Sequence, residues 1–387
     1  MKKIKILLAL LSFSVTVWSQ REEIPLNEEW RFSLKPQTEI SVTDDWTTVN
    51  IPHTWNAQDA QNNTEHLSGW QGKNKTTYYR GTGWYAKRFM VPEEWKGRRI
   101  FVRFEAASIV ATIYINGQIL GDHKGAFTAF CFELTDEIEW GKENELRVEV
   151  DNRWRADVPP ISGGFGMFGG LYRPVKLIVT APLCITPLHY ASSGVYVDTR
   201  KLTSDTAEID VRSVLQYGKY SYSKLDPRVP ETDATVETVV KNAEGREVTR
   251  QIQKFHLYSG TNTICKTSLV LSDPIRWNGR KNPYLYTAEV KVRENGILVD
   301  SLSQTFGLRT VGITQENGFE LNGVPYPVYG VSRHQDMKDK GWALSKADEE
   351  ADMDCIKDIG ANKCTTITRH WRDSNSYGAL SAKYLYP

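Results

Sequence analysis

The chain has 387 residues, of which 40% are hydrophobic and 25% are charged, and its formal net charge is +1. This length suits two or three domains, each large enough to bury a core. Lysine and arginine are spread evenly along the chain. The sequence therefore lacks the basic stripe that is typical of nucleic-acid-binding proteins.

The N-terminus is typical of a secretory signal peptide. Lysines come first, an apolar run from Ile6 to Val17 follows, and a small residue, Ser19, stands at the expected cleavage point. The apolar run is shorter than the roughly 20 residues that cross a bilayer. We therefore expect residues 1–19 to be removed and the protein to be periplasmic or secreted, without a membrane anchor. The alternative is a buried N-terminal helix.

The region from residue 20 to residue 185 has a β pattern. Apolar and polar residues alternate on both sides of Asn116-Gly117, which predicts a hairpin because both turn residues must take positive φ. Eight of the twelve tryptophans lie between Trp30 and Trp154; they fit a β core, or some of them line a sugar pocket. Many short strands joined by long loops predict a jelly-roll sandwich.

A second β block covers residues 186–312. Its alternating segments are short and numerous, and Asn295-Gly296 marks another hairpin tip. That number of strands over this length predicts an immunoglobulin-like sandwich. The five cysteines of the chain are far apart and form no C-x-x-C pair, so neither a zinc site nor a disulfide framework is indicated.

The pattern changes after residue 313. A turn at Asn322-Gly323 precedes a short apolar strand that ends at Val331, and a polar loop follows it. Ser345 and Asp348 then form a predicted capping box for a helix that ends near Gly360. Strand, polar loop and helix form one βα unit. One such unit cannot bury its strand on both faces, so we expect it to be poorly ordered or to dock on a sandwich.

These motifs together resemble glycoside hydrolase family 2, the β-galactosidase and β-glucuronidase family. GTGWYAKRF, INGQILG and FGGLYRPV resemble its N-terminal sugar-binding domain, and PYLYTAEVKV with FGLRTV resembles the end of its sandwich domain. GFELNGVPYPVYGVSRHQD, followed by a helix ending in DIGAN, resembles the start of its catalytic barrel. The resemblance implies a mainly β chain: a jelly-roll sugar-binding domain, an immunoglobulin-like sandwich, and only the first βα unit of a (β/α)8 barrel.

The resemblance also implies a retaining mechanism with two glutamates on later barrel strands. Family members carry the acid/base in an Asn-Glu pair, which occurs here only inside the first β block, at Asn27-Glu28 and Asn144-Glu145. No catalytic residue is therefore assigned. From about residue 363 the tail departs from the family pattern, for which we hypothesise a frameshift or an early stop, and residues 313–387 are expected to form an incomplete barrel.

Three substrate-binding residues follow from the same resemblance: His334 after the first barrel strand, and Asn152 and Asp157 in the loop DNRWRADVPP. The alternative for each is a role in bracing its loop. Trp70 and Asn74 in another loop are further candidates. No metal ligands or cofactor are evident, although some relatives use Mg²⁺ or Na⁺.

The predicted function is that of a β-galactosidase acting on terminal β-linked galactose of oligosaccharides, in a chain that is itself an inactive fragment. The full-length relative is a possible homo-oligomer. The alternatives are a non-catalytic carbohydrate-binding protein and another family 2 specificity, such as that of a β-glucuronidase.

Overall fold

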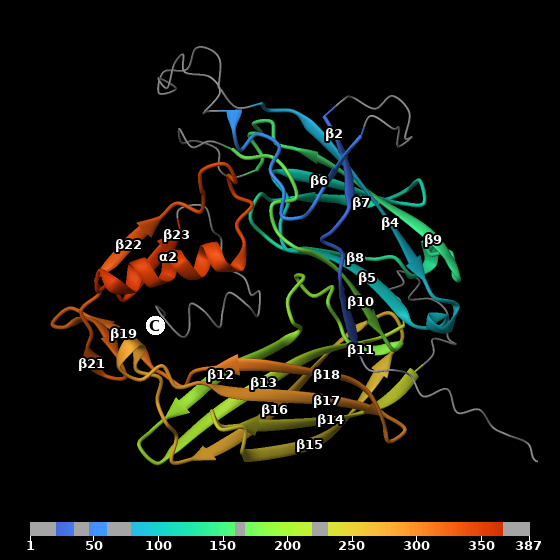
Figure 1. Cartoon of the computed structure of the whole chain (residues 1–387). Coiled ribbons are helices and arrows are strands. Elements are labelled where there is room, and N and C mark those ends of the chain that lie inside the picture. The colour runs from blue at the N-terminus through green and yellow to red at the C-terminus, as the bar shows by residue number, and fades with distance from the viewer. Residues whose placement is uncertain (1–20, 35–45, 60–78, 159–166, 219–230, 367–387) are drawn as a thin grey trace, which may run out of the picture.

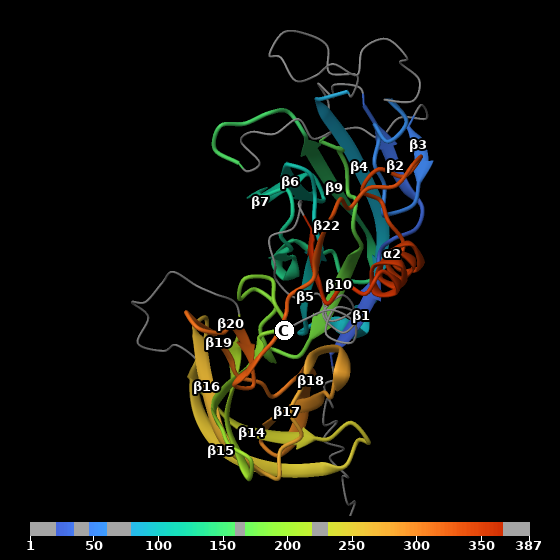
Figure 2. The same ribbon diagram turned by 90° about the vertical axis from the view of Figure 1, so that its left-hand side faces the viewer.

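In a computed structural model, the chain is mainly β and is described for residues 21–34, 46–59, 79–158, 167–218 and 231–366. Two β-sandwiches are stacked end to end, and a small βαβ unit lies beside the first of them (Figures 1 and 2). The predicted signal peptide lies outside the described residues.

The first sandwich is built from antiparallel strands. They are β1 (Glu22–Pro25), β2 (Trp30–Ser33), β3 (Thr47–Val49), β4 (Thr82–Val91), β5 (Arg99–Phe104), β6 (Val110–Ile115), β7 (Gln118–Lys124), β8 (Phe130–Glu133), β9 (Lys142–Asp151) and β10 (Val175–Thr180), with short 3-10 helices at Glu93–Trp95 and Thr135–Glu137. Within the described residues, a sheet of order β1-β10-β5-β8 packs on a sheet of order β3-β2-β4-β9-β6-β7. This two-sheet architecture agrees with the predicted jelly roll.

The core of this sandwich follows from the alternation seen in the sequence. In β9, every second side chain from Asn144 to Val150 is buried between the sheets. Asn116 and Gly117 have positive φ and join β6 to β7, which confirms the predicted hairpin. Trp30 is fully buried, and its indole nitrogen donates to the carbonyl of Leu26 at 2.6 Å. Core packing therefore accounts for this tryptophan.

The second sandwich also has two antiparallel sheets. Its strands are β11 (Leu183–Ile185), β12 (Val195–Leu202), β13 (Thr206–Tyr217), β14 (Glu231–Lys241), β15 (Glu247–Tyr258), β16 (Asn262–Ser272), β17 (Tyr286–Glu294) and β18 (Ile297–Phe306), with a 3-10 helix at Gly279–Lys281. One sheet pairs β13 with β11, β12 and β16, and the other has the order β15-β14-β17-β18. The hairpin at Asn295-Gly296 joins β17 to β18 as predicted.

A buried ion pair ties the start of the described chain to the second sandwich. The Arg21 guanidinium binds both carboxylate oxygens of Asp300, with Nε–Oδ1 at 3.0 Å and Nη2–Oδ2 at 2.8 Å. The two side chains are 7% and 0% exposed. Asp300 Oδ2 also accepts from the backbone nitrogen of Ile185 at 2.8 Å. One carboxylate thus fixes two segments that meet at the junction of the sandwiches.

The third segment forms two small units. They are a hairpin sheet of β19 (Val311–Thr314), β20 (Gly318–Leu321) and β21 (Val324–Pro325), and a βαβ unit of β22 (Gly330–Arg333), α2 (Lys346–Asp358) and β23 (Lys363–Thr366). β22 and β23 are parallel neighbours. The βα unit predicted at the start of a barrel is therefore present. Regular structure continues to Thr366, past the point where the sequence pattern is expected to change.

A partly buried histidine of the first sandwich, His53, is expected to make the stability of the protein sensitive to acid. His53 is partly buried, and its Nδ1 lies 2.8 Å from the hydroxyl of Tyr85. Burial lowers the pKa of His53 from its ordinary 6.5 to about 4. As the pH falls from about 6.5 to 4, the unfolded chain binds a proton that the folded chain does not, so the free energy of unfolding decreases by up to about 3 kcal/mol.

Urea unfolding at pH 7.5 and pH 4.5 measures this effect. We expect His53→Gln to be less stable at pH 7.5 but to lose less additional stability on acidification than the parent chain. Parallel losses in both proteins would show that His53 does not set the acid sensitivity.

Candidate functional site

The polar loop between β22 and α2 is fixed at its helix end by a charged carboxylate. At the helix end, the Ser345 hydroxyl accepts from the Asp348 backbone nitrogen at 3.3 Å, and Asp348 Oδ2 accepts from the Ser345 nitrogen at 2.8 Å. This confirms the capping box. Lys340 donates to the same carboxylate at 2.7 Å. These bonds, of which that to Lys340 has the largest effect, lower the pKa of Asp348 to about 2. The carboxylate is therefore charged and fastens the loop to the helix.

Trp342 anchors this loop to the first sandwich. It is 3% exposed and belongs to an apolar cluster made otherwise of first-sandwich residues. Its ring contacts three aromatic rings there, with centroids 5.2–5.6 Å apart: Phe127, Phe168 and Tyr172. The Thr54 hydroxyl donates to the carbonyl of Lys340 at 2.6 Å. The segment thus docks, which was one of its two expected states. Trp342 was missed by the sequence reasoning, although a bulky aromatic residue in a polar loop is a usable signal.

A buried chain of polar groups lies beside Trp342. Arg173 of the first sandwich donates through Nη2 to Gln335 Oε1 at 3.0 Å, and Gln335 Nε2 donates to Glu349 Oε1 at 3.4 Å. The three residues are between 5% and 9% exposed. Because buried polar groups need partners, this chain fixes how the first sandwich, the loop and α2 meet. The residue next to Gln335 is therefore held in place by its neighbour.

That residue is His334, which is exposed directly after the C-terminal end of β22. In (β/α)8 barrels the active site lies at this end of the strands. The preceding Arg333 points to the helix instead, where its Nε donates to Asp352 Oδ2 at 2.7 Å. An ion pair thus shapes the loop, and His334 remains at its surface.

Asn152 lies where it cannot contact a substrate. Its side chain is fully buried; Oδ1 accepts from the Gly81 nitrogen at 2.8 Å, and Nδ2 donates to the carbonyls of Met167 at 3.0 Å and Tyr79 at 3.3 Å. Asn56 is equally buried and bonds the same two carbonyls at 3.1 Å. The prediction that Asn152 binds sugar is therefore corrected. The side-chain amides of Asn56 and Asn152 therefore hydrogen-bond to the backbone and hold the ends of neighbouring loops together.

Asp157 lies on the surface and has cationic partners. It accepts from Arg155 Nε and from Lys124 Nζ, both at 3.0 Å, and these bonds lower the pKa of Asp157 to about 2. The next residue, Val158, belongs to the Trp342 cluster. The loop after β9 therefore lies against the loop that bears His334.

Two further candidate residues fall in a part of the chain that the structure leaves undescribed. Trp70 and Asn74 lie outside the described ranges.

Within the described ranges, no group of three His, Cys, Asp or Glu side chains is placed to hold a metal ion. None of the helices in these ranges has the length and apolar character of a membrane span. All five cysteines are free.

Comparison with known proteins gives two family matches in chain order. Residues 24–182 match the model of the glycosyl hydrolases family 2 sugar binding domain, and residues 193–309 match the model named glycosyl hydrolases family 2. A β-glucuronidase of Bacteroides fragilis is 34% identical over 362 residues, which are 93% of this chain and 48% of that protein. A β-galactosidase of Thermoanaerobacter pseudethanolicus is 30% identical over 74% of this chain and 36% of its own length.

Solved structures have the same fold. A putative β-galactosidase from Bacteroides fragilis is 33% identical with a TM-score of 0.82, over 95% of this chain and 52% of that one. A β-glucuronidase from Bacteroides uniformis is 28% identical with a TM-score of 0.83, over 95% and 41%. The chain thus spans about half the length of these relatives or less.

Proposed function

The chain belongs to the glycosyl hydrolases family 2, and we propose that it builds part of the sugar-binding face of a glycosidase that acts on terminal β-linked sugars of oligosaccharides. The observation that carries this proposal is the docking of the β22–α2 loop on the first sandwich through Trp342. Through this contact the loop that bears His334 packs against Val158, the residue after Asp157. Pockets that combine an apolar surface with a few polar groups suit sugars.

Galactose is the first sugar we propose, because the RHQD and KGWALS motifs resemble the β-galactosidase branch. Glucuronic acid is the second candidate, since the relative with 34% identity is named a β-glucuronidase. A neutral sugar and an acidic sugar differ by one carboxylate. Binding measurements with both sugars therefore separate the two specificities.

We further propose that the 387-residue polypeptide does not hydrolyse these substrates on its own. Retaining hydrolysis needs two carboxyl groups about 5–5.5 Å apart, one as nucleophile and one as acid/base. Three carboxylates next to the loop already have other partners: Asp348 binds Lys340 and Ser345, Asp352 binds Arg333, and Glu349 is buried against Gln335. These groups stabilise the loop and are poor candidates for the catalytic pair.

The test combines an activity assay with a binding assay on the purified 387-residue chain. We expect no release of nitrophenol from nitrophenyl β-galactoside or β-glucuronide, together with saturable quenching of tryptophan fluorescence by galactose or glucuronate. His334→Ala should weaken this binding several-fold, because an imidazole that donates to a sugar hydroxyl contributes about 1 kcal/mol.

The exposed His256→Ala, on β15 of the second sandwich, is the matched control and should bind like the parent chain. Turnover of either nitrophenyl glycoside would refute the proposed lack of activity. Equal binding by His334→Ala and the parent would refute the proposed site. Tight binding of an internal oligosaccharide segment, without preference for a sugar end, would favour a non-catalytic carbohydrate-binding protein.

A further inference from the structure

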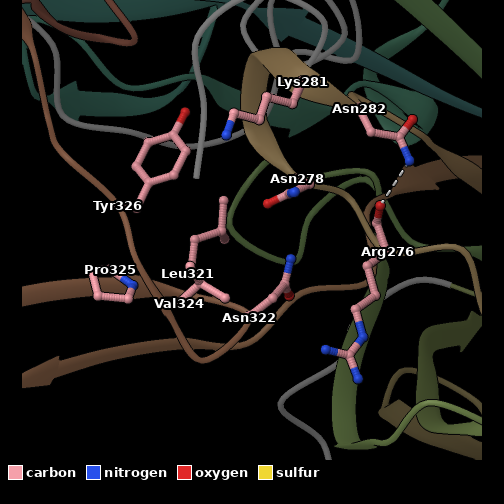
Figure 3. Close-up of a pocket in the computed structure, with 9 residues that line it drawn as sticks. All are labelled: Arg276, Asn278, Lys281, Asn282, Leu321, Asn322, Val324, Pro325 and Tyr326. Carbon is pink, nitrogen blue, oxygen red and sulfur yellow. Dashed lines mark hydrogen bonds between the residues drawn. The ribbon is translucent and has the colours of Figure 1, made fainter.

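A pocket lies between the second sandwich and the hairpin that precedes β22 (Figure 3). Its volume is about 410 Å³, which lies in the range of small-molecule sites. It is lined by Arg276, Asn278, Lys281, Asn282, Leu321, Asn322, Val324, Pro325 and Tyr326. The hairpin residues come before β22 and His334 comes after it, so this pocket is at the opposite end of that strand from His334.

Hydrogen bonds hold the two walls of the pocket together. In the sandwich wall, the Asn278 nitrogen donates to the Asn282 carbonyl at 2.7 Å. The hairpin wall is joined to it by Asn322, whose Nδ2 donates to the Trp277 carbonyl at 3.0 Å and whose Oδ1 accepts from the Thr310 nitrogen at 3.1 Å. Because these bonds are internal to the protein, the pocket is formed before any ligand arrives.

Gly279 lets the two walls approach each other closely. It has a φ of +56°, and a Cβ at this position would overlap the hydroxyl of Tyr326. The backbone conformation therefore favours glycine, and a side chain here would displace the phenol ring. The absence of a side chain allows the phenol ring to lie beside the 3-10 helix that carries Lys281. Figure 3 shows the Lys281 ammonium on the same side as the Tyr326 ring, and the Asn278 amide between the walls.

The charge of the lining has one sign. Lys281 and Arg276 are cationic, and none of the nine lining residues is a carboxylate. Among the described residues, the side chains of Lys281, Arg276 and Asn278 make no hydrogen bond or ion pair with the protein. Within the part of the chain that the structure describes, these donors are therefore available to a ligand. Cations without a protein partner favour an anion, because hydrogen bonds between charged groups are about twice as strong as neutral ones.

We propose that this pocket binds a hydroxylated organic anion of monosaccharide size, such as an acidic or sulfated sugar. The Lys281 ammonium would hold the carboxylate or sulfate. The Asn278 amide and the Tyr326 hydroxyl would bind ring hydroxyls, and the apolar side chains of Leu321 and Val324 would contact the ring. A neutral sugar would leave the cation without its partner.

Ligand-observed NMR titration of the full chain tests this proposal with four probes: glucuronate, galactose 6-sulfate, galactose and inorganic sulfate. We expect at least one of the two sugar anions to bind about tenfold more tightly than both galactose and sulfate, which corresponds to about 1.4 kcal/mol. The sugar anion that binds identifies the charged group. Lys281→Met should remove the preference for the anion, and Gly279→Ala should weaken binding of that anion by displacing Tyr326.

Two controls locate the effect. Lys96→Met, at an exposed lysine of the first sandwich, and His334→Ala should both keep the preference for the sugar anion. Thermal unfolding of Lys281→Met should match the parent, because its side chain is exposed. The proposal is overturned if galactose or sulfate binds His334→Ala as tightly as the tighter-binding sugar anion does, if Lys281→Met keeps the preference, or if either control loses it.

Discussion

Asp300→Ala is expected to destabilise the chain by about 3–5 kcal/mol, the usual cost of removing one partner from a buried ion pair. The Arg21 guanidinium, 7% exposed, would remain in the junction without its carboxylate. The Ile185 nitrogen would lose its acceptor at the same time. Urea unfolding followed by tryptophan fluorescence would show a lower midpoint.

A surface ion pair supplies the matched control for this prediction. Asp198 accepts from Arg212 at 2.9 Å, with both side chains more than 40% exposed. Asp198→Ala should therefore cost less than about 1 kcal/mol. The double substitution Arg21→Met with Asp300→Leu should recover part of the lost stability, because it leaves no buried charge. Similar losses in Asp300→Ala and Asp198→Ala would contradict the assigned role of the buried pair.

Local features of this fold were predictable from the sequence. The hairpins at Asn116-Gly117 and Asn295-Gly296 and the capping box at Ser345 each depend on residues within a few positions of one another. Turn and cap chemistry is set by such neighbours. For the same reason, the order of strand, polar loop and helix along the chain was enough to place His334 at a strand end.

Contacts between distant segments were not predictable in this way. Arg21 and Asp300 are 279 positions apart, and Thr54 and Lys340 are 286 apart. The alternation of apolar and polar residues predicts which face of a strand is buried, but it does not predict which segment of the chain covers that face. The assignment of Asn152 to sugar binding failed for this reason: nothing in the sequence shows that Gly81, Tyr79 and Met167 would use both ends of its amide.

Trp342→Ala should release the βαβ unit from the first sandwich. A buried tryptophan replaced by alanine typically costs about 3–5 kcal/mol through lost contacts and the remaining cavity. This free energy is lost from the contact between the βαβ unit and the first sandwich, because the other members of the cluster belong to the first sandwich. Hydrogen exchange of the backbone amides in α2 and β23 should become much faster, while exchange in β9 and β14 should change little.

Trp154→Ala provides the control, because Trp154 is 60% exposed on the first sandwich and its removal leaves no cavity. Trp342→Phe keeps part of the aromatic contact with Phe168 and Tyr172, so its exchange rates should lie between those of the parent and Trp342→Ala. The sugar binding that we propose for His334 should be weakest in Trp342→Ala and intermediate in Trp342→Phe, since undocking moves this histidine away from the loop of Asp157. Unchanged exchange in α2 of Trp342→Ala would mean that the chain from Arg173 through Gln335 to Glu349 holds the unit without the tryptophan.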